Sequence, residues 1–209
     1  MTDSAEAALE HLRDSSQFQW YVIPLLLMVL YVYSVEVERR NWSVLLGGLA
    51  FWGMDWFNEI WNSAVFHATG KAPVWGAPGD SAYQILIGLN IEISFMFAIM
   101  GIVAIKILPA DKNMRILGIN NRVVFACVGA GLAVAIEILL NQMGVLTWEW
   151  SWWSAGMPIL IFLFGYLPFF AAAYLVHDMT KLRHQITAVS VIFGVDAVAL
   201  VILGTVGWL

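Results

Sequence analysis

Six apolar segments, each about as long as a bilayer's hydrocarbon core is thick, constrain this chain more than any other feature. A helix needs about 20 consecutive apolar residues to cross that core. The 209 residues are 61% hydrophobic and 12% charged, far from the composition of a soluble domain. The segments cover approximately residues 18–35, 43–66, 83–108, 123–143, 157–176 and 186–208. We therefore predict an all-α polytopic membrane helix bundle of six transmembrane helices, with seven as the alternative count.

The start of the chain differs from the rest. Residues 1–17 are polar and lack the cationic start of a signal peptide. Apolar residues between Ala5 and Leu12 recur at helical spacing, so a short surface helix is one interpretation and a polar tail is the other. Residues 18–209 then form a single transmembrane domain.

Positive charges are distributed unequally between the two ends of the predicted bundle. The loops after the first, third and fifth segments carry eight Lys or Arg residues, whereas the other side carries only Arg13 and Lys71. Because cytoplasmic loops carry an excess of Lys and Arg, we expect both termini on the exterior side. The predicted location is a bacterial inner membrane, with the lipid bilayer as partner. Nothing in the sequence resembles a nucleic-acid-binding basic patch.

Five carboxylic acids lie inside the apolar segments, and no Lys or Arg lies at their depth to neutralise them. An ionised acid at the bilayer centre costs roughly 2.5 to 3.5 kcal/mol on insertion scales. Such acids must therefore be protonated, clustered or turned towards a polar cavity. The five acids are Asp55, Glu59, Glu92, Glu137 and Asp196. We predict that they come together from four helices in one buried site that opens outward.

The second apolar segment carries the most information about this site. Polar and aromatic residues recur there at steps of three and four, so they share one face of a helix. Hydrocarbon cannot satisfy amide and carboxyl groups, so this face must point into the bundle. The stripe consists of Phe51, Trp52, Asp55, Asn58, Glu59, Asn62 and Phe66. Trp56, in the same segment, is too deep for the interfacial belt in which tryptophans anchor helices.

The third and fourth segments offer partners at matching depth. Gln84, Gly88 and Glu92 follow one another by a helical turn, which places Glu92 towards the shared interior. Glu137 and Asn141 continue a face of small residues that permits close helix approach.

The fifth segment and one outer loop add two further expectations. Pro168 should free the carbonyl of Phe164 and aim Tyr166 at the cavity; a kink that only improves packing is the alternative. Loop 67–81, rich in Gly and Pro, is either a lid with Trp75 at its tip or an inert connector.

The sequence lacks the residues that several other types of chemistry require. The four His residues are widely separated, and the chain has no HExxH, GxSxG or Walker motif and no mid-membrane Lys that could hold retinal. One Cys leaves no disulfide framework. We expect no cofactor and no metal; a divalent ion held by several acids with His67 is the open alternative.

Acids, amides and aromatic rings in an apolar chamber suit two activities. A carboxyl group in low dielectric stays protonated and acts as general acid, while a hydrogen-bonded neighbour acts as base. Aromatic faces stabilise a developing carbocation. This combination predicts a membrane-embedded cyclase or isomerase acting on an apolar isoprenoid-like substrate. A proton- or cation-coupled transporter would use the same groups, and a structural role as hydrogen-bonded glue is the third interpretation.

Two short patches resemble known families. The FNEIW around Glu59 and the GVDAVAL around Asp196 are similar to an early Glu and a final-span Asp in small polytopic terpene cyclases of meroterpenoid and indole-diterpenoid pathways. This resemblance implies that Glu59 and Asp196 handle protons at an epoxide or alkene, although those enzymes usually have seven spans. EILLNQMGVLTWEW (137–150) resembles the acid-plus-WxW segment of membrane carotenoid-modifying proteins, which again implies an isoprenoid.

Each candidate residue then receives a predicted role. Glu59 is the general acid. Its base or tuning partners are Asp55, Glu92, Glu137 and Asp196. The substrate-binding residues are Trp52 and Trp56, as a cation-stabilising wall, and Asn58, Asn62, Asn141 and Tyr166. The identity of the substrate and the oligomeric state stay open.

Overall fold

The computed structural model describes residues 1–209, apart from the side chain of Gln17. The chain is mostly helical, as predicted. Its helices are α1 (Asp3–Glu10), α2 (Val22–Glu38), α3 (Trp42–Thr69), α4 (Ile91–Lys106), α5 (Asn121–Gln142), α6 (Pro158–Leu160), α7 (Leu167–Asp178) and α8 (Leu182–Thr205). A 3-10 helix, η1 (Ser15–Gln17), follows α1, and a π-helix, η2 (Ile161–Tyr166), joins α6 to α7.

Short strands form three small antiparallel pairs at the ends of the helices. They are β1 (Trp75–Gly76), β2 (Gln84–Leu86), β3 (Leu89–Asn90), β4 (Arg115–Ile116), β5 (Ile119–Asn120) and β6 (Thr147–Trp148). β2 pairs with β3 and β4 with β5, whereas β1 pairs with β6 and so ties the loop after α3 to the loop after α5.

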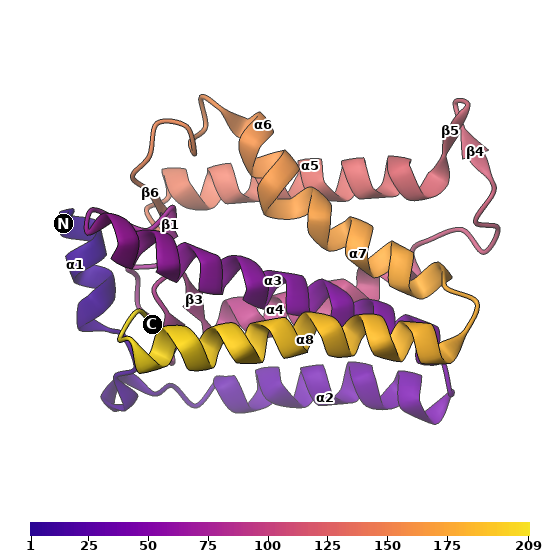
Figure 1. The fold of residues 1–209 in the computed structure, drawn as a ribbon, viewed down its shortest axis with the longest axis horizontal. Coiled ribbons are helices and arrows are strands. Elements are labelled where there is room, and N and C mark those ends of the chain that lie inside the picture. Colours follow the sequence, from indigo (N-terminus) through magenta and orange to yellow (C-terminus); the bar gives the residue numbers. More distant parts are fainter.

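The long helices lie side by side along one direction (Figure 1). Both termini, α1 and the β1–β6 pair lie at one end, which we call the outer end. The β4–β5 hairpin lies at the other, the basic end. Ala5 and Ala8 of α1 are buried against Phe66 and Ile87, so the predicted surface helix at the start of the chain is present.

The third apolar segment is only partly helical, which corrects the sequence prediction. Residues 84–90 form the β2–β3 hairpin, and α4 begins only at Ile91. The Asn90 side chain caps α4 by accepting a hydrogen bond from the Ile93 amide at 2.8 Å. Gln84 and Gly88 therefore do not share a helix face with Glu92.

Among the described residues, three helical rods are long and apolar enough to cross a membrane. They are α5, the continuous α6–η2–α7 rod (Pro158–Asp178) and α8. α2 and α4 have 17 and 16 residues, slightly less than a full span, and α3 carries the polar stripe. The chain is thus an integral membrane protein, with its other long helices packed beside these three rods.

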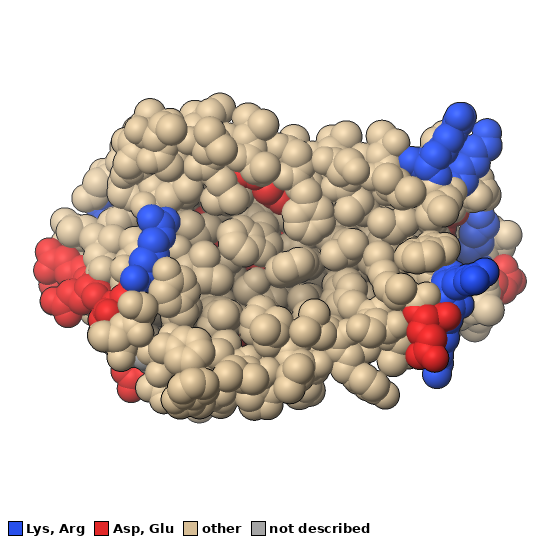
Figure 2. Space-filling view, turned by 90° about the horizontal axis from the view of Figure 1, so that it is seen from below, with Lys and Arg blue, Asp and Glu red and all other residues tan. Residues whose placement is uncertain are grey.

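On the face shown in Figure 2, most charged side chains gather at the two ends, and the band between them is uncharged except for a small acidic patch. Most Lys and Arg residues lie at the basic end. Two ion pairs connect helices there: Lys106 of α4 lies 2.5 Å from Glu36 of α2, and Arg122 of α5 holds Asp178 of α7 through two contacts of 2.8 and 3.0 Å.

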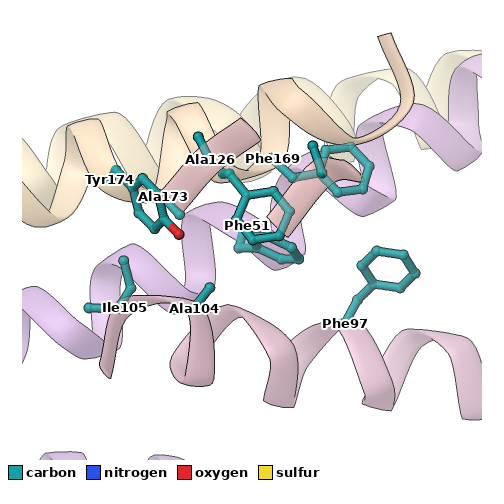
Figure 3. Packing of buried hydrophobic residues seen from close by; sticks show 10 residues of the cluster. Phe51, Phe97, Ala104, Ile105, Ala126, Phe169, Ala173 and Tyr174 are labelled. Atoms are coloured by element: carbon teal, nitrogen blue, oxygen red, sulfur yellow. The ribbon is translucent and has the colours of Figure 1, made fainter. Parts of the chain in front are cut away.

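A cluster of buried aromatic residues fills the interior between α3, α4 and α7 (Figure 3). Phe51 of α3 is fully buried and contacts Phe97 of α4 and Phe169 and Phe170 of α7, with ring centroids 5.0 to 6.1 Å apart. Such edge-to-face and offset pairs stabilise the packing beyond the burial of their area. In the described part of the chain, the cluster leaves no cavity at the centre of the α3–α4–α7 contact on the basic side of Phe97 and Phe169.

Close approach of α3 and α4 depends on Gly101. A Cβ atom built on Gly101 would lie 2.6 Å from the Gly48 carbonyl oxygen and 2.9 Å from Cβ of Phe51. We expect Gly101→Ala to force the two helices apart and to lower stability by about 1–3 kcal/mol, the usual cost of overpacking. Thermal unfolding of purified protein would measure it.

Gly131→Ala in α5 is the matched control, because a Cβ there meets nothing within 4 Å. Alanine also has the better helix propensity, so this variant should unfold at the wild-type temperature or slightly above. Equal losses in both variants would contradict the close-approach argument.

Candidate functional site

A cavity of about 50 Å³ lies in the outer half of the bundle, between α3, α5, the η2–α7 rod and the outer loops. Its polar lining consists of Asp55, Asn58, Glu59, Glu137 and Tyr166. Its aromatic lining consists of Trp75, Phe97, Trp153 and Phe169. The cavity therefore combines carboxyl groups with aromatic faces, as the sequence predicted, but through a partly different set of aromatic residues.

Four of the five predicted acids form one buried group. Asp55, Glu59, Glu137 and Asp196 are each at most 5% exposed. Asp55 interacts electrostatically with Glu59 and Asp196, and Glu59 with Glu137, so the acids form a series from α5 through α3 to α8. Asp196 does not line the cavity itself but lies behind Asp55. The site thus draws acids from three helices and not from the four that were predicted.

Several carboxyl oxygens of this group lack a hydrogen-bond partner within the described part of the chain. They are Asp55 Oδ2, Glu59 Oε2 and both oxygens of Asp196. Among the described residues no Lys or Arg lines the cavity. Neighbouring acids without cations cannot all ionise, because like charges at close range repel and burial removes water.

Glu59 is held by the outer loop. The Trp75 indole N–H donates to Glu59 Oε1 at 2.9 Å, and the Trp75 ring stacks on Trp153 with centroids 5.3 Å apart. Trp75 belongs to loop 67–81, and its side chain is buried and lines the cavity. The loop thus covers the cavity, and we call it the lid.

Asn62 attaches this lid to α3. Its side chain accepts from the Val74 amide at 2.7 Å and donates to the Trp75 carbonyl at 2.7 Å. Asn141 similarly donates to the Leu146 carbonyl at 3.0 Å, close to the start of β6. Both amides, which were predicted to orient a substrate, hold outer loops instead.

We expect Asn62→Leu to loosen the lid, because it leaves the Val74 amide and the Trp75 carbonyl buried without partners. An unsatisfied buried group costs about 1–3 kcal/mol. Hydrogen exchange of the backbone amides of residues 72 and 74–76 should become faster, while α7 amides stay protected. Asn113→Leu, at an exposed site at the basic end, is the control. Equal acceleration of the lid amides in this control variant would contradict a local role for Asn62.

The Asn58 side chain binds backbone carbonyl groups in the irregular part of the fifth span, the π-helix η2. Its amide donates to the carbonyls of Phe164 and Gly165, both at 3.2 Å. These carbonyls lie in η2, just before Pro168, where the wider π-helical turn frees backbone groups. The Phe164 carbonyl thus accepts a side-chain hydrogen bond and Tyr166 lines the cavity, as expected, with a π-helical turn at this point of the span.

Glu137 lies against three aromatic side chains. The Trp148 indole N–H donates to its Oε1 at 2.9 Å, and Tyr166 and Trp153 lie beside it. Trp148 and Trp153 are not among the site residues predicted from the sequence. The signal that distinguishes them is the β1–β6 pairing, which folds this Trp-rich loop back over the cavity.

Three predicted site residues lie elsewhere. Glu92 starts α4, accepts from the Ala82 amide at 2.7 Å and from the Tyr21 hydroxyl, and faces α2. Glu92 thus lies in the first turn of α4, where the helix dipole favours a carboxylate, and connects α4 to the loop at Ala82 and to Tyr21. Trp52 donates to Ser94 Oγ at 3.0 Å, and Trp56 packs towards α8. The wall formed by Trp52 and Trp56 is thus replaced by Trp75, Trp153, Phe97 and Phe169.

The described residues contain no group of three or more His, Cys, Asp or Glu side chains arranged to hold a metal ion. His67, the proposed extra ligand, stacks on Trp208 with centroids 6.5 Å apart.

Comparisons with known proteins identify relatives but no activity. The model of an uncharacterized membrane protein family matches residues 2–205. An uncharacterized protein of Archaeoglobus fulgidus is 56% identical over 209 residues, which cover all of this chain and 99% of that protein. A second one from the same organism is 50% identical over 54 residues, 25% of this chain and 96% of that protein. No solved structure matches the chain.

Proposed function

The chain belongs to this uncharacterized membrane protein family, and from its buried carboxyl group cluster we propose that it is a membrane-embedded acid/base enzyme, a cyclase or isomerase, acting on an isoprenoid-like substrate. The observation that carries the proposal is the joint lining of one cavity by Glu59, Asp55 and Glu137 and by four aromatic rings. Proton donors and acceptors thereby meet surfaces that attract a cation.

Glu59 is suited to the role of general acid. Trp75 holds its Oε1, while its Oε2 is buried without a partner and so is left to carry a proton. Transfer of that proton to an alkene or epoxide would break the O–H bond and leave a carbocation on the substrate. The faces of Trp75 and Trp153 would stabilise this cation, by about 2 kcal/mol when desolvated.

Asp55 or Glu137 would then remove a proton from the neighbouring carbon, which forms the product alkene and returns the proton to the acid series. Asp196, behind Asp55, would act as a proton reserve and not as a group in contact with the substrate. The resemblance to terpene cyclases at Glu59 and Asp196 supports a proton-handling role for both residues. In our proposal Glu59 contacts the substrate, whereas Asp196 supplies protons through Asp55.

We also propose a membrane topology for this enzyme. α2, α3 and α4 would cross the membrane beside the three apolar rods, giving six spans, with both termini outside and the basic end in the cytoplasm. The relatives are archaeal, so they lend no support to a bacterial inner membrane over an archaeal cell membrane.

The test compares membrane lipids of cells producing wild type, Glu59→Gln or Glu92→Gln. Glu92 is the matched control, since it is an acid of the same bundle that lies outside the cavity. Mass spectrometry of isoprenoid lipids should show a species consumed or formed with wild type and Glu92→Gln but not with Glu59→Gln, at equal protein abundance. Identical lipid profiles in all three would contradict the enzyme.

A proton- or cation-coupled transporter is the second candidate. It is favoured by the cavity volume of about 50 Å³, which holds only a few water-sized groups, and by the acid series that extends across α3. Proteoliposomes containing a pH-sensitive dye distinguish the two: Glu59-dependent proton uptake under an imposed potential would favour the transporter.

A further inference from the structure

The carboxyl cavity is too small for a whole isoprenoid, so the hydrocarbon part of the substrate must lie outside it. A groove of about 470 Å³ lies directly beside the cavity, between α3 and the α6–η2–α7 rod. Asn58 and Trp153 line both spaces. The groove and the cavity are therefore adjacent parts of one site, separated by these two side chains.

The groove is apolar, aromatic and open on the side of the bundle. Phe57, Trp61, Trp152 and Phe164 line it, and each of them is more than one-third exposed. Phe164 belongs to a rod that is long and apolar enough to cross the membrane. Exposed aromatic side chains on such a rod meet lipid, so a molecule dissolved in the bilayer reaches the groove without crossing water.

Trp153 contributes a polar atom at the junction. Its side chain is 2% exposed, and its indole N–H makes no hydrogen bond of good geometry within the described residues, although the Glu137 carboxyl group lies beside it. This buried donor can therefore bind an oxygen at the reacting end of a substrate next to Glu137. The junction is thus polar at one point, while the groove beyond it is apolar.

We propose that the groove between α3 and the α6–η2–α7 rod binds the hydrocarbon chain of an isoprenoid substrate entering from the bilayer, with its reacting end placed past Trp153 among the carboxyl groups. This inference rests on the proposed function, since it assigns a chain to the substrate of that reaction. The groove holds the apolar part of the substrate, and the cavity takes only the atoms that gain and lose protons.

A cysteine-protection experiment tests binding without requiring turnover. Leu160 lies in the groove wall near the outer end, and Leu160→Cys in a Cys127→Ser background places one thiol there. Geranylgeraniol, added to the protein in detergent, should slow modification of this thiol by N-ethylmaleimide several-fold, as followed by intact mass. Protection should persist in Glu59→Gln, because that variant alters chemistry and leaves the groove unchanged.

The wild-type protein supplies the matched control. Cys127, the chain's single cysteine, lines a comparable apolar groove of about 360 Å³ between α5 and α7 that shares no residue with the carboxyl cavity. Geranylgeraniol should not protect Cys127 at the same concentration. Adding Met54→Trp, which fills the α3 groove, should abolish protection of the thiol at position 160 without lowering the thermal midpoint by more than a few degrees.

Equal protection at both thiols would indicate partitioning into the detergent and would overturn the inference, as would protection that survives Met54→Trp. Failure of the proposed function would look different: the groove would protect, but no lipid would change in a Glu59-dependent way. Conversely, Glu59-dependent lipid chemistry with an unprotected groove would refute the groove and leave the enzyme standing.

Discussion

Glu59→Gln is expected to lower turnover of the isoprenoid substrate by at least about 100-fold, the lower range of a general acid's contribution. Gln has nearly the shape of Glu, and its amide oxygen can still accept the hydrogen bond that Trp75 donates to Glu59 Oε1 at 2.9 Å. It cannot deliver a proton from the second position, where Oε2 has no partner. Product formation per mole of purified protein is the measurement.

Glu92→Gln is expected to keep nearly full turnover, because Glu92 lies outside the cavity, on the side of α4 that faces α2. Thermal unfolding of both variants is needed beside the assay. If Glu59→Gln retains turnover within a factor of two or three of Glu92→Gln, Glu59 is not the acid. If it loses activity only together with its fold, the structural interpretation of the acids gains support.

Gly88→Ala is expected to disrupt the site more than any other single methyl group. A Cβ at Gly88 would lie 2.6 Å from Nδ2 of Asn62, 2.7 Å from Oε2 of Glu59 and 2.8 Å from Cδ1 of Trp75. The side chains of these three residues are held by other hydrogen bonds, from Trp75 to Glu59 Oε1 and between Asn62 and the lid backbone, so none can move freely. We expect a stability loss of about 1–3 kcal/mol, together with loss of turnover because Glu59 and Trp75 are displaced.

The control is Gly79→Ala in the same outer loop, where a Cβ meets nothing within 4 Å. That variant should match wild type in both thermal unfolding and turnover. Hydrogen exchange across residues 72–90 would locate the disturbance. A Gly88→Ala protein with wild-type lid protection would show that the outer loop accommodates the methyl group and that Gly88 is not required for the site.

Much of the site could be predicted because α3 is one long helix. Its 3.6-residue period alone places Asp55, Glu59 and Asn62 on one face, and lipid cannot satisfy those groups on the outside. The lid was foreseeable from the Gly and Pro content of loop 67–81, and the freed Phe164 carbonyl from Pro168. Each of these features depends on residues near one another in the chain.

The wrong assignments come from an unpredicted hairpin and from contacts between helices. Glu92 was expected at a membrane depth that matches that of Glu59 and Glu137, but the β2–β3 hairpin delays the start of α4 to Ile91, and Glu92 binds the Ala82 amide instead. Trp52 and Trp56 lie on edges of the α3 stripe that meet α4 and α8. No periodicity within α3 reveals which neighbour each edge will face.

By itself the sequence determined a helical membrane protein with unpaired acids turned inward, because the bilayer offers neither water nor counter-ions to a carboxyl group. Only the tertiary structure decided which acids share a cavity and which rings surround it. The rotation of each helix about its axis is set by close contacts such as Gly48 with Gly101, and Trp75 and Trp153 are brought together by the β1–β6 pairing. These contacts join residues far apart in the chain, and their geometry follows from packing the whole bundle at once.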